Sequence, residues 1–426
     1  MTAAGAEASI EARLVAAGLP PLRRTTWLEI DTDALASNLR LVRTLAPRGA
    51  RLGAVLKANA YGHGLEVAAR TFAAAGADLL CVATVDEALH LRSIGLQLPI
   101  LVIFEVPHDA VGEARARGVE LVAADPAGLP ALLAAAASAG AAIGGRPAQA
   151  LRLHLEVETG LVRGGFQPAE AGEAAARIAG APGVELAGLW THLASSHDPA
   201  AIARQRERFD QGVAALRAHG VAVPPRAWAA SGGLLAEAAG DSELVRPGLV
   251  LYGVPPDRFP VAPRAAAAVA GLRPAMTLKV RPLRVAPLAV GEPLGYGGLW
   301  TAERPSVVAT LPVGYGDGWA RAYSGRTQAL VRGRRVPLVG SVAMDAVMAD
   351  VTDVPGVTTQ DEFVLLGEQG GERISAADLA LVRNTISWEV LASMSARVAR
   401  VYHASTGLTG LRTLAGEQLR PEERRV

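Results

Sequence analysis

Short apolar runs that alternate with helical patterns between residues 52 and 252 constrain the fold of this chain more than any other feature. Repeated strands separated by helices form a parallel sheet, and eight of them close into a barrel. We therefore predict an α/β fold, a (β/α)8 TIM-like barrel. The alternative is an open doubly wound sheet, and the lack of a G-x-G-x-x-G motif after the first run weighs against it. The apolar runs are Leu52–Leu56, Leu79–Ala83, Ile100–Phe104, Val119–Ala123, Leu151–Val157, Val184–Trp190, Arg226–Ala230 and Leu249–Tyr252.

The pattern changes after Pro274, where helical periodicity fades and short β-like runs separated by proline and glycine take over. We predict a C-terminal β-rich domain there. The expected division is an N-terminal extension (1–24), a barrel (25–270) that begins with a strand at Trp27–Ile30, a C-terminal β domain (271–410) and a charged, frayed tail (411–426). The β-like runs are Met276–Val280, Val307–Pro312, Gln328–Val331, Val336–Val339, Ala346–Val351 and Glu362–Leu365.

Composition narrows the class of protein. Of 426 residues, 50% are hydrophobic and 19% charged, which allows a large core and argues against disorder. The net charge of +1, without a basic run, indicates neither nucleic acid nor an anionic membrane as a partner. The alanine-rich segment Gly128–Ile143 is too short and too weakly hydrophobic to span a bilayer. One cysteine, Cys81, and no secretory signal favour the cytoplasm. No histidine or cysteine cluster has metal-ligand spacing.

A single lysine ends the first apolar run in the stretch AVLKANAYGHG (54–64). A strand there places Lys57 at its C-terminal end, where α/β barrels gather their chemistry. Apolar neighbours disfavour the charged amine, which lowers its pKa and makes it a better nucleophile for carbonyl groups. The ordinary alternative is a lysine that caps a strand and reaches solvent.

Further polar groups follow other predicted strands and should gather on the same face of the barrel. Each has a structural alternative: a turn for Ser231, a buried core group for His192 and an ion pair for Arg246. Together they describe a phosphate cup, a reactive lysine and an arginine beside a planar ligand, as pyridoxal phosphate requires. The groups are Lys57 and Tyr61, Arg163, His192, Ser231, and Arg246 with Gly248-Leu249.

In the C-terminal part, Tyr296 lies between two glycines, so a loop can bring it close to a ligand. A hairpin tyrosine is the alternative. The stretches around Tyr315 (LPVGYGDGW) and Met344 (VAMD) stand out for the same reason and carry the same alternative.

These motifs resemble the pyridoxal phosphate-dependent alanine racemase family, over residues 24–403. The motifs that carry the resemblance are AVLKANAYGHG (54–64), ETGLVRGG (158–165), THLASSHD (191–198), RPGLVLYG (246–253), GYGGLWTA (295–302), LPVGYGDGWAR (311–321) and VAMD (342–345). The resemblance implies a barrel, a C-terminal β domain and a homodimer whose active sites join the barrel of one subunit to the β domain of the other.

The resemblance also assigns roles. Lys57 would hold pyridoxal 5'-phosphate as an imine, and the small amino-acid substrate would be alanine. Lys57 and Tyr296 would be the two bases that remove and return the Cα proton on opposite faces. Tyr296 and Met344 would come from the partner subunit. The cofactor-binding residues would be Lys57, Tyr61, Arg163, His192, Ser231, Arg246, Gly248, Leu249 and Tyr252, and the substrate-binding residues Arg163, Tyr315 and Met344.

Two positions depart from the family pattern. Glu156 stands where the family has a lysine, carbamylated in many members, and its carboxylate is expected to orient Arg163. The alternative is an exposed strand residue. Ala396 stands where the family has a tyrosine that contacts the cofactor phosphate and narrows the pocket. We expect a wider pocket that accepts larger amino acids such as serine.

Two other functions stay open at this point: a fold-related decarboxylase of basic amino acids, and a non-catalytic paralogue that binds the cofactor or a D-amino acid. The Tyr296 and Tyr315 motifs argue against the first, and retention of both Lys57 and Tyr296 argues against the second.

Overall fold

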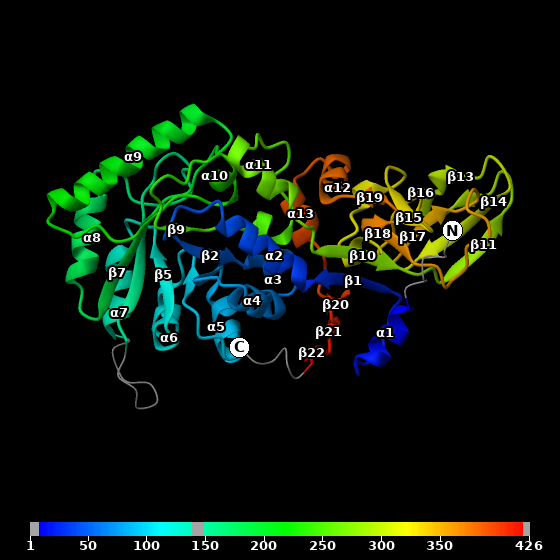
Figure 1. The fold of residues 1–426 in the computed structure, drawn as a ribbon, viewed down its shortest axis with the longest axis horizontal. Helices are drawn as coiled ribbons and strands as arrows, with labels where there is room; N and C mark the ends of the chain where they lie inside the picture. Colours follow the sequence, from blue (N-terminus) through cyan, green and yellow to red (C-terminus); the bar gives the residue numbers. More distant parts are fainter. Residues whose placement is uncertain (1–7, 139–148, 421–426) are drawn as a thin grey trace. The chain divides into compact units, whose positions relative to one another are not determined.

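The computed structural model describes residues 8–138 and 149–420, and the chain divides into two compact units (Figure 1). One unit, called here the barrel unit, comprises Ala36–Ala60 and Ala68–Arg273. The other, the β unit, comprises Met1–Leu35, Tyr61–Val67 and Pro274–Arg425. The short segment Tyr61–Val67 therefore belongs to the β unit although its sequence neighbours belong to the barrel unit.

An eight-stranded sheet forms the centre of the barrel unit, in the order β8-β7-β6-β5-β4-β3-β2-β9, with every pair parallel. Strands β3, β4 and β5 are buried along their whole length, as expected where helices cover a parallel sheet. The strands are β2 (Arg51–Val55), β3 (Leu79–Val82), β4 (Ile100–Val102), β5 (Val119–Ala123), β6 (Leu151–Glu156), β7 (Val184–Trp190), β8 (Arg226–Ala227) and β9 (Leu244–Val245).

The two end strands, β8 and β9, close this sheet into a barrel. Glu243 N donates to Arg226 O at 2.8 Å, Arg246 N donates to Ala229 O at 2.9 Å, and Ala230 and Arg246 form a parallel bridge. The predicted barrel is therefore confirmed, and the open doubly wound sheet is wrong.

Helices follow most barrel strands and pack on them; Figure 1 shows α8 and α9 outside β7. Local sequence sets their starts: Thr84 and Glu87 form a capping box at α5, and Asp198 caps α9 ahead of Pro199. The helices are α2 (Thr32–Arg43), α3 (Lys57–Tyr61), α4 (Leu65–Ala74), α5 (Val85–Ser93), η1 (His108–Ala110), α6 (Val111–Ala116), α7 (Leu129–Ser138), α8 (Ala171–Gly180), α9 (Pro199–Ala218), α10 (Ser231–Leu235), η2 (Leu249–Tyr252) and α11 (Pro263–Ala270).

The eighth strand is not where the sequence predicts it. The apolar run Leu249–Tyr252 is the 3-10 helix η2, and the strand is Leu244–Val245. All four residues of η2 are buried, and a short buried apolar run does not reveal by itself whether it is strand or helix. Pro247 has no N–H for a ladder, and the Gly248 backbone (φ −122°, ψ −93°) turns the chain before the run begins.

The β unit contains a 12-stranded sheet, ordered β11-β14-β17-β16-β15-β18-β10-β1-β20-β21-β22 with β19 paired to β18, and a separate β12–β13 pair. The β-rich second domain is thus confirmed. Its strands are β1 (Thr26–Asp31), β10 (Met276–Val280), β11 (Arg284–Leu288), β12 (Pro293–Leu294), β13 (Trp300–Thr301), β14 (Ser306–Leu311), β15 (Gln328–Val331), β16 (Arg334–Val339), β17 (Val347–Asp350), β18 (Phe363–Gln369), β19 (Glu372–Ile374), β20 (Ala399–Ala404), β21 (Gly407–Thr413) and β22 (Gly416–Leu419). Its helices are α1 (Ile10–Ala16), η3 (Tyr296–Gly298), η4 (Tyr315–Asp317), η5 (Arg321–Tyr323), α12 (Ala376–Arg383) and α13 (Ser387–Ala392).

Strand β1 belongs to this sheet and not to the barrel in which the sequence analysis places it. It pairs antiparallel with β10 and parallel with β20. Residues 26–30 are all buried, which is the pattern of a central strand covered on both faces. An apolar run close to a helix does not say which sheet the run joins.

The tail expected from residue 411 is structured as far as β22, which pairs antiparallel with β21. Leu408 and Leu411 are buried in a small core with Ile10 and Leu14 of α1, and this contact stabilises both ends of the chain. The last residues, 421–426, lie outside the described part, as do 1–7 and the end of the predicted Gly128–Ile143 segment. No helix within the described ranges combines the length and apolar character needed to cross a bilayer.

Candidate active site

A left-handed turn follows strand β2 and presents Lys57. The φ angles of Ala58, Asn59, Ala60 and Tyr61 are 55°, 56°, 54° and 51°. This conformation costs about 1–2 kcal/mol per residue with a side chain, so surrounding contacts must hold it. Ala60 N donates to Leu56 O at 2.7 Å, and Ala58 N donates to the Glu87 carboxylate at 2.7 Å. Strain of this kind concentrates at functional sites.

Phe104 lies beneath two cations of the site. Lys57 Nζ is 5.6 Å and Arg163 Cζ 4.9 Å from the centroid of its ring. Burial lowers the pKa of Lys57, the neighbouring Arg163 lowers it further, and Glu87 opposes them. A larger share of the amine is therefore neutral near pH 7 than for a lysine in solvent, which suits a nucleophile or a base.

Arg163 lies beside Glu156, the last residue of β6, with 3.8 Å between Arg163 Nη2 and Glu156 Oε1. The Glu156 side chain is only 7% exposed, so it is not the exposed strand residue that was the alternative. Burial raises the pKa of Glu156 to about 7, against the opposing effect of Arg163. The carboxyl therefore changes charge near neutral pH.

The loop that carries Arg163 is held by the carboxylate of Glu158, which lies in the same loop, and by residues from neighbouring segments. Glu158 accepts hydrogen bonds from the backbone N–H groups of Gly160 and Val162. Thr159 Oγ1 is 2.8 Å from Thr191 Oγ1 and accepts from Gln205 Nε2 at 2.8 Å. This support was not predicted from the sequence, because Thr191, which follows β7, and Gln205, in α9, are far from Thr159 in the chain.

Arg246 is buried at the centre of the barrel unit's polar cluster. One guanidinium nitrogen, Nη2, donates to Thr191 O at 2.8 Å, and the guanidinium lies 4.3 Å from the ring centroid of Trp190. Burial lowers the pKa of Arg246 to about 10, so it stays charged at neutral pH. Its other terminal nitrogen, Nη1, is buried and has no hydrogen-bond acceptor among the described residues. A ligand acceptor would satisfy it.

His192 is a neutral imidazole in this environment. Burial and the charges of Arg246, Arg163 and Lys57 together lower its pKa to about 3, and burial has the largest effect. Three cations acting on one histidine show that the structure brings these predicted residues together. His192 can therefore be a buried, neutral side chain and still belong to the predicted site.

Ser231 begins α10, and its Oγ accepts from Gly248 N at 3.0 Å. The serine hydroxyl and the Gly248-Leu249 backbone are thus adjacent, as the predicted phosphate cup requires. Tyr252 lies in η2, and its hydroxyl donates to Val55 O at 2.8 Å. This bond ties η2 to the strand that ends before Lys57. Direct contact of Tyr252 with a cofactor stays a prediction.

The remaining predicted residues lie in the β unit. Tyr61 is buried, whereas the side chains expected to come from a partner subunit or to meet the substrate are exposed: Tyr296 by 75%, Tyr315 by 43% and Met344 by 52%. Tyr315 and Met344 are on paired segments, since Tyr315 N donates to Ala343 O at 3.0 Å and Gly316 N to Met344 O at 3.0 Å. Their functional roles, and the pairing of Tyr296 with Lys57, stay predictions.

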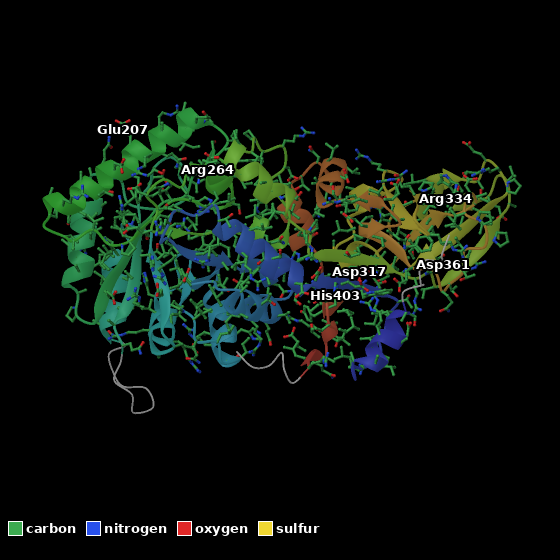
Figure 2. All side chains as sticks on the ribbon, in the orientation of Figure 1. Glu207, Arg264, Asp317, Arg334, Asp361 and His403 are labelled. Carbon is green, nitrogen blue, oxygen red and sulfur yellow. The ribbon has the colours of Figure 1, made fainter. Side chains whose placement is uncertain are left out.

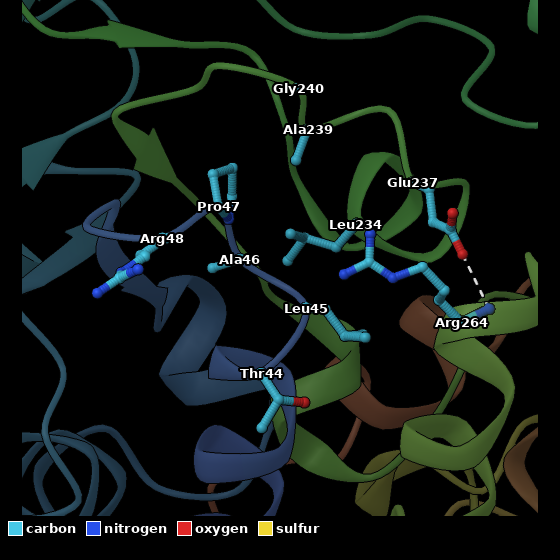
Figure 3. Close-up of a pocket in the computed structure, with 10 residues that line it drawn as sticks. All are labelled: Thr44, Leu45, Ala46, Pro47, Arg48, Leu234, Glu237, Ala239, Gly240 and Arg264. Atoms are coloured by element: carbon cyan, nitrogen blue, oxygen red, sulfur yellow. Dashed lines mark hydrogen bonds between the residues drawn. The ribbon is translucent and has the colours of Figure 1, made fainter.

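A separate cavity of about 460 Å³ lies between the loop after α2, the end of α10 and the start of α11 (Figure 3). None of the predicted site residues lines it. Glu237 accepts from Arg264 N at 2.9 Å, and Figure 3 shows the Arg264 guanidinium pointing away from that carboxylate. In the described part of the chain, no group of histidine, cysteine, aspartate and glutamate side chains is arranged to hold a metal ion.

Comparisons with known proteins agree with this geometry. Residues 30–256 match the family model of the alanine racemase N-terminal domain, and residues 275–402 match that of the C-terminal domain. An alanine racemase of Symbiobacterium thermophilum is 39% identical over 388 residues, which is 90% of this chain and 98% of that protein.

Solved structures give the same result. An alanine racemase from Streptomyces lavendulae, a producer of D-cycloserine, superposes with a TM-score of 0.81 at 34% identity, over 90% of this chain and 98% of that one. The alanine racemase of Bacillus anthracis with bound L-Ala-P superposes with a TM-score of 0.83 at 28% identity, over 93% and 99% of the two chains.

Proposed function

The chain belongs to the alanine racemase family and interconverts L- and D-alanine, and we propose that it does so with pyridoxal 5'-phosphate bound at Lys57. The observation that supports this most directly is the lysine amine whose pKa is lowered by burial and by the neighbouring cation Arg163. The matches over nearly the whole chain are to racemases, so we set aside a basic amino-acid decarboxylase.

The residues of the barrel unit fit this cofactor. Lys57 supplies an amine for its aldehyde, and Ser231 with the Gly248 backbone supplies polar groups at the start of a helix for its phosphate. The unsatisfied Nη1 of Arg246 supplies a donor for its ring nitrogen. We also propose Tyr61, His192, Leu249 and Tyr252 as cofactor neighbours, with His192 as a neutral hydrogen-bonding group.

Racemisation needs one proton removed and another delivered on the opposite face. When bound, pyridoxal phosphate acts as an electron sink that makes the Cα–H of an attached amino acid acidic. We propose that Lys57 Nζ takes or returns the proton on one face and the Tyr296 hydroxyl does so on the other. A lysine in solvent has a pKa of about 10, so the site must favour the deprotonated form of Lys57. Burial near Arg163 has that effect on Lys57.

Substrate binding is assigned to Arg163, Tyr315 and Met344. Arg163 is a planar donor suited to the substrate carboxylate, and Glu156 beside it holds the guanidinium without a carbamylated lysine. The small ligand in the Bacillus anthracis relative, L-Ala-P, is consistent with a small amino-acid substrate.

We further propose a homodimer with shared active sites, in which Tyr296 and Met344 reach the barrel of the partner subunit. Both side chains are more than half exposed, so both are available to contact a partner chain. In this arrangement the barrel unit is the cofactor-binding part, and the β unit carries the residues that face the partner.

The test is to incubate the purified protein and pyridoxal phosphate with L-alanine and, separately, D-alanine in deuterium oxide. Both solutions should lose optical rotation and gain Cα deuterium, and Lys57→Ala should do neither. Tyr296→Phe should lose racemisation yet still exchange the proton of one enantiomer, because one base remains. Full racemisation by Tyr296→Phe would contradict the two-base assignment. No racemisation by the wild-type chain would overturn the proposed function.

A further inference from the structure

Asp317, labelled in Figure 2, is a fully buried carboxylate held by two arginines in the β unit. Arg24 donates from Nη1 at 2.7 Å and from Nη2 at 3.2 Å, Arg397 Nε donates at 2.6 Å, and Gly314 N donates at 3.0 Å. Burial raises the pKa of Asp317, but the bonds from Arg24 and Arg397 outweigh it, so its pKa lies below the ordinary value. The carboxylate is therefore a permanent anion at neutral pH.

Arg397 connects this buried anion to a second segment. While Nε bonds Asp317, Nη2 bonds the carboxylate of Asp345. Asp317 follows Tyr315 by two residues, and Asp345 directly follows Met344. One guanidinium thus spans the segments that carry the two exposed side chains assigned to the substrate.

The backbones of these segments also approach closely. A Cβ on Gly314 would lie 2.2 Å from Ala343 O, and one on Gly316 would lie 3.1 Å from Arg397 Cζ. Ser395 N donates to Asp317 O at 3.0 Å, so the segment with Ala396 joins the same arrangement. Only glycine fits at position 314, because a Cβ there would overlap a backbone oxygen, whereas a side chain at position 316 would press against Arg397.

We propose that Arg397 is a positioning residue for the racemase reaction, which fixes Tyr315 and Met344 relative to each other by bridging Asp317 and Asp345. The proposal rests on the proposed function, because it needs Tyr315 and Met344 to meet the substrate. Arginine is suited to the task, since its planar fork bonds two carboxylates in set directions, whereas lysine is a point charge on a flexible stem.

The burial of Asp317 contrasts with the exposure of Tyr315 and Met344, and this contrast argues against a purely structural role for Arg397. Asp317 is inaccessible, yet Tyr315 and Met344 remain 43% and 52% exposed. Replacing a buried ionic group by apolar residues of similar volume is often neutral or stabilising. A charged bridge between the segments that carry two exposed side chains is therefore better explained by the positioning of those segments than by stabilisation of the core.

The test compares Arg397→Lys with wild type in two measurements. Alanine kinetics should show a KM raised about fivefold or more and a kcat changed less, because ground-state positioning is lost. The NMR signal of the Met344 methyl, one of five methionines and assigned with Met344→Leu, should shift or broaden without substrate. Arg332→Lys, which breaks the fork with Asp361 at 2.7 and 3.0 Å elsewhere in the β unit, is the matched control and should change neither.

Asp345→Asn is the second variant in case Arg397→Lys fails to fold, since Asp345 is 65% exposed and its loss leaves the Asp317 bond in place. It should move the same two readouts by a smaller amount, about twofold in KM. A KM within error of wild type together with an unmoved Met344 signal, in either folded variant, overturns the proposal. If the wild-type chain fails to racemise alanine, the proposed function fails, while the Met344 signal still tests the positioning.

Discussion

The Arg163 guanidinium lies 3.8 Å from the carboxylate of Glu156, which is nearly inaccessible to solvent. Arg163 is the residue proposed to bind the substrate carboxylate, and Glu156 is an acid that ionises near neutral pH. Burial raises the pKa of Glu156 from 4.5 to about 7, and the charges of Glu158 and Glu105 act in the same direction. The charge of the Glu156–Arg163 pair therefore changes as the pH passes through about 7.

The first prediction concerns Glu156→Gln. The carboxyl becomes an anion as the pH rises through about 7, so it holds Arg163 above that pH and loses the ion pair below it. Wild-type KM for L-alanine should fall about threefold to tenfold between about pH 6 and about pH 8, and the glutamine variant should lack this step. KM measured across this range checks it. Glu105→Gln, which removes a nearby negative charge, should keep the step but move it to lower pH. An identical step in Glu156→Gln would assign the titration to another group.

The second prediction concerns Arg246→Lys. A lysine ammonium is a point charge, so it cannot lie over Trp190 and donate to Thr191 O as the guanidinium does and also replace the second donor, Nη1, which is free to bind a ligand acceptor. We expect the affinity for pyridoxal phosphate to fall about tenfold, measured by fluorescence titration of the cofactor-free protein. Arg226→Lys, whose wild-type side chain pairs with Asp241 and Glu243 away from this site, should bind the cofactor normally. Unchanged affinity in Arg246→Lys would remove Arg246 from the cofactor site.

The fold could be predicted where the hydrophobic periodicity of a segment and its length indicate the same kind of element. Seven of the eight barrel strands and the C-terminal β region follow from apolar runs spaced by helices or by proline and glycine. The eighth strand was wrong because Leu249–Tyr252 is as apolar as a strand, and burial makes a 3-10 helix look the same. The sheet of β1 was not predictable, because pairing with β10 and β20 joins segments more than 240 residues apart.

The residues of the candidate site could be predicted where they directly follow the C-terminal ends of barrel strands. Lys57, Arg163, His192, Ser231 and Arg246 follow β2, β6, β7, β8 and β9, which are neighbours in the closed barrel, so their ends lie together. The packing partners were not predictable from the same rule. The residue types of Phe104, Trp190, Thr191 and Gln205 do not identify these partners, and only three-dimensional contact shows that they support cations or the Arg163 loop. The left-handed turn after Leu56 has a partial signal in its asparagine and glycine, but its alanines gave none.

The third prediction concerns stability and Glu417. Burial, and then the nearby acid Glu66, raise the pKa of Glu417 to about 8, against the effects of Arg412 and Tyr402. The folded state therefore binds a proton that the unfolded state releases near pH 4.5, and stability falls as the pH rises from about 4.5 to about 8. Glu417→Gln should match wild type at the acidic end and be more stable by about 1–2 kcal/mol near pH 8, allowing for partial solvent screening.

Urea unfolding at both pH values tests this, with exposed Glu303→Gln as the control. A variant less stable than wild type at high pH would show that the carboxylate is stabilising.

The fourth prediction concerns Ala396, where the family pattern has a tyrosine. A smaller side chain leaves room at the substrate, so the chain should accept L-serine beside L-alanine. Ala396→Tyr should lower kcat/KM for L-serine relative to L-alanine about tenfold, because a serine hydroxymethyl group then meets a ring. The measurement is kcat/KM for both substrates in both proteins. An unchanged ratio would mean that position 396 does not shape the pocket.

The fifth prediction separates a steric contact from backbone strain in the segment that follows Lys57. Gly64 has φ +111°, and a Cβ there would lie 2.1 Å from the Tyr402 hydroxyl oxygen, whereas Gly291 has φ +82° and no atom within 4 Å of such a Cβ. Both substitutions to alanine strain the backbone, by about 1 kcal/mol each, but only Gly64→Ala also forces Tyr402 to move. Tyr402 is fully buried, so that movement disturbs the core between β20 and the Tyr61–Val67 segment.

We expect Gly64→Ala to lose about 2–3 kcal/mol more than Gly291→Ala in urea unfolding. It should also weaken cofactor binding, because the displaced segment is continuous with the turn that presents Lys57. Equal losses in the two variants would mean that Tyr402 relaxes freely and that this contact does not hold the turn.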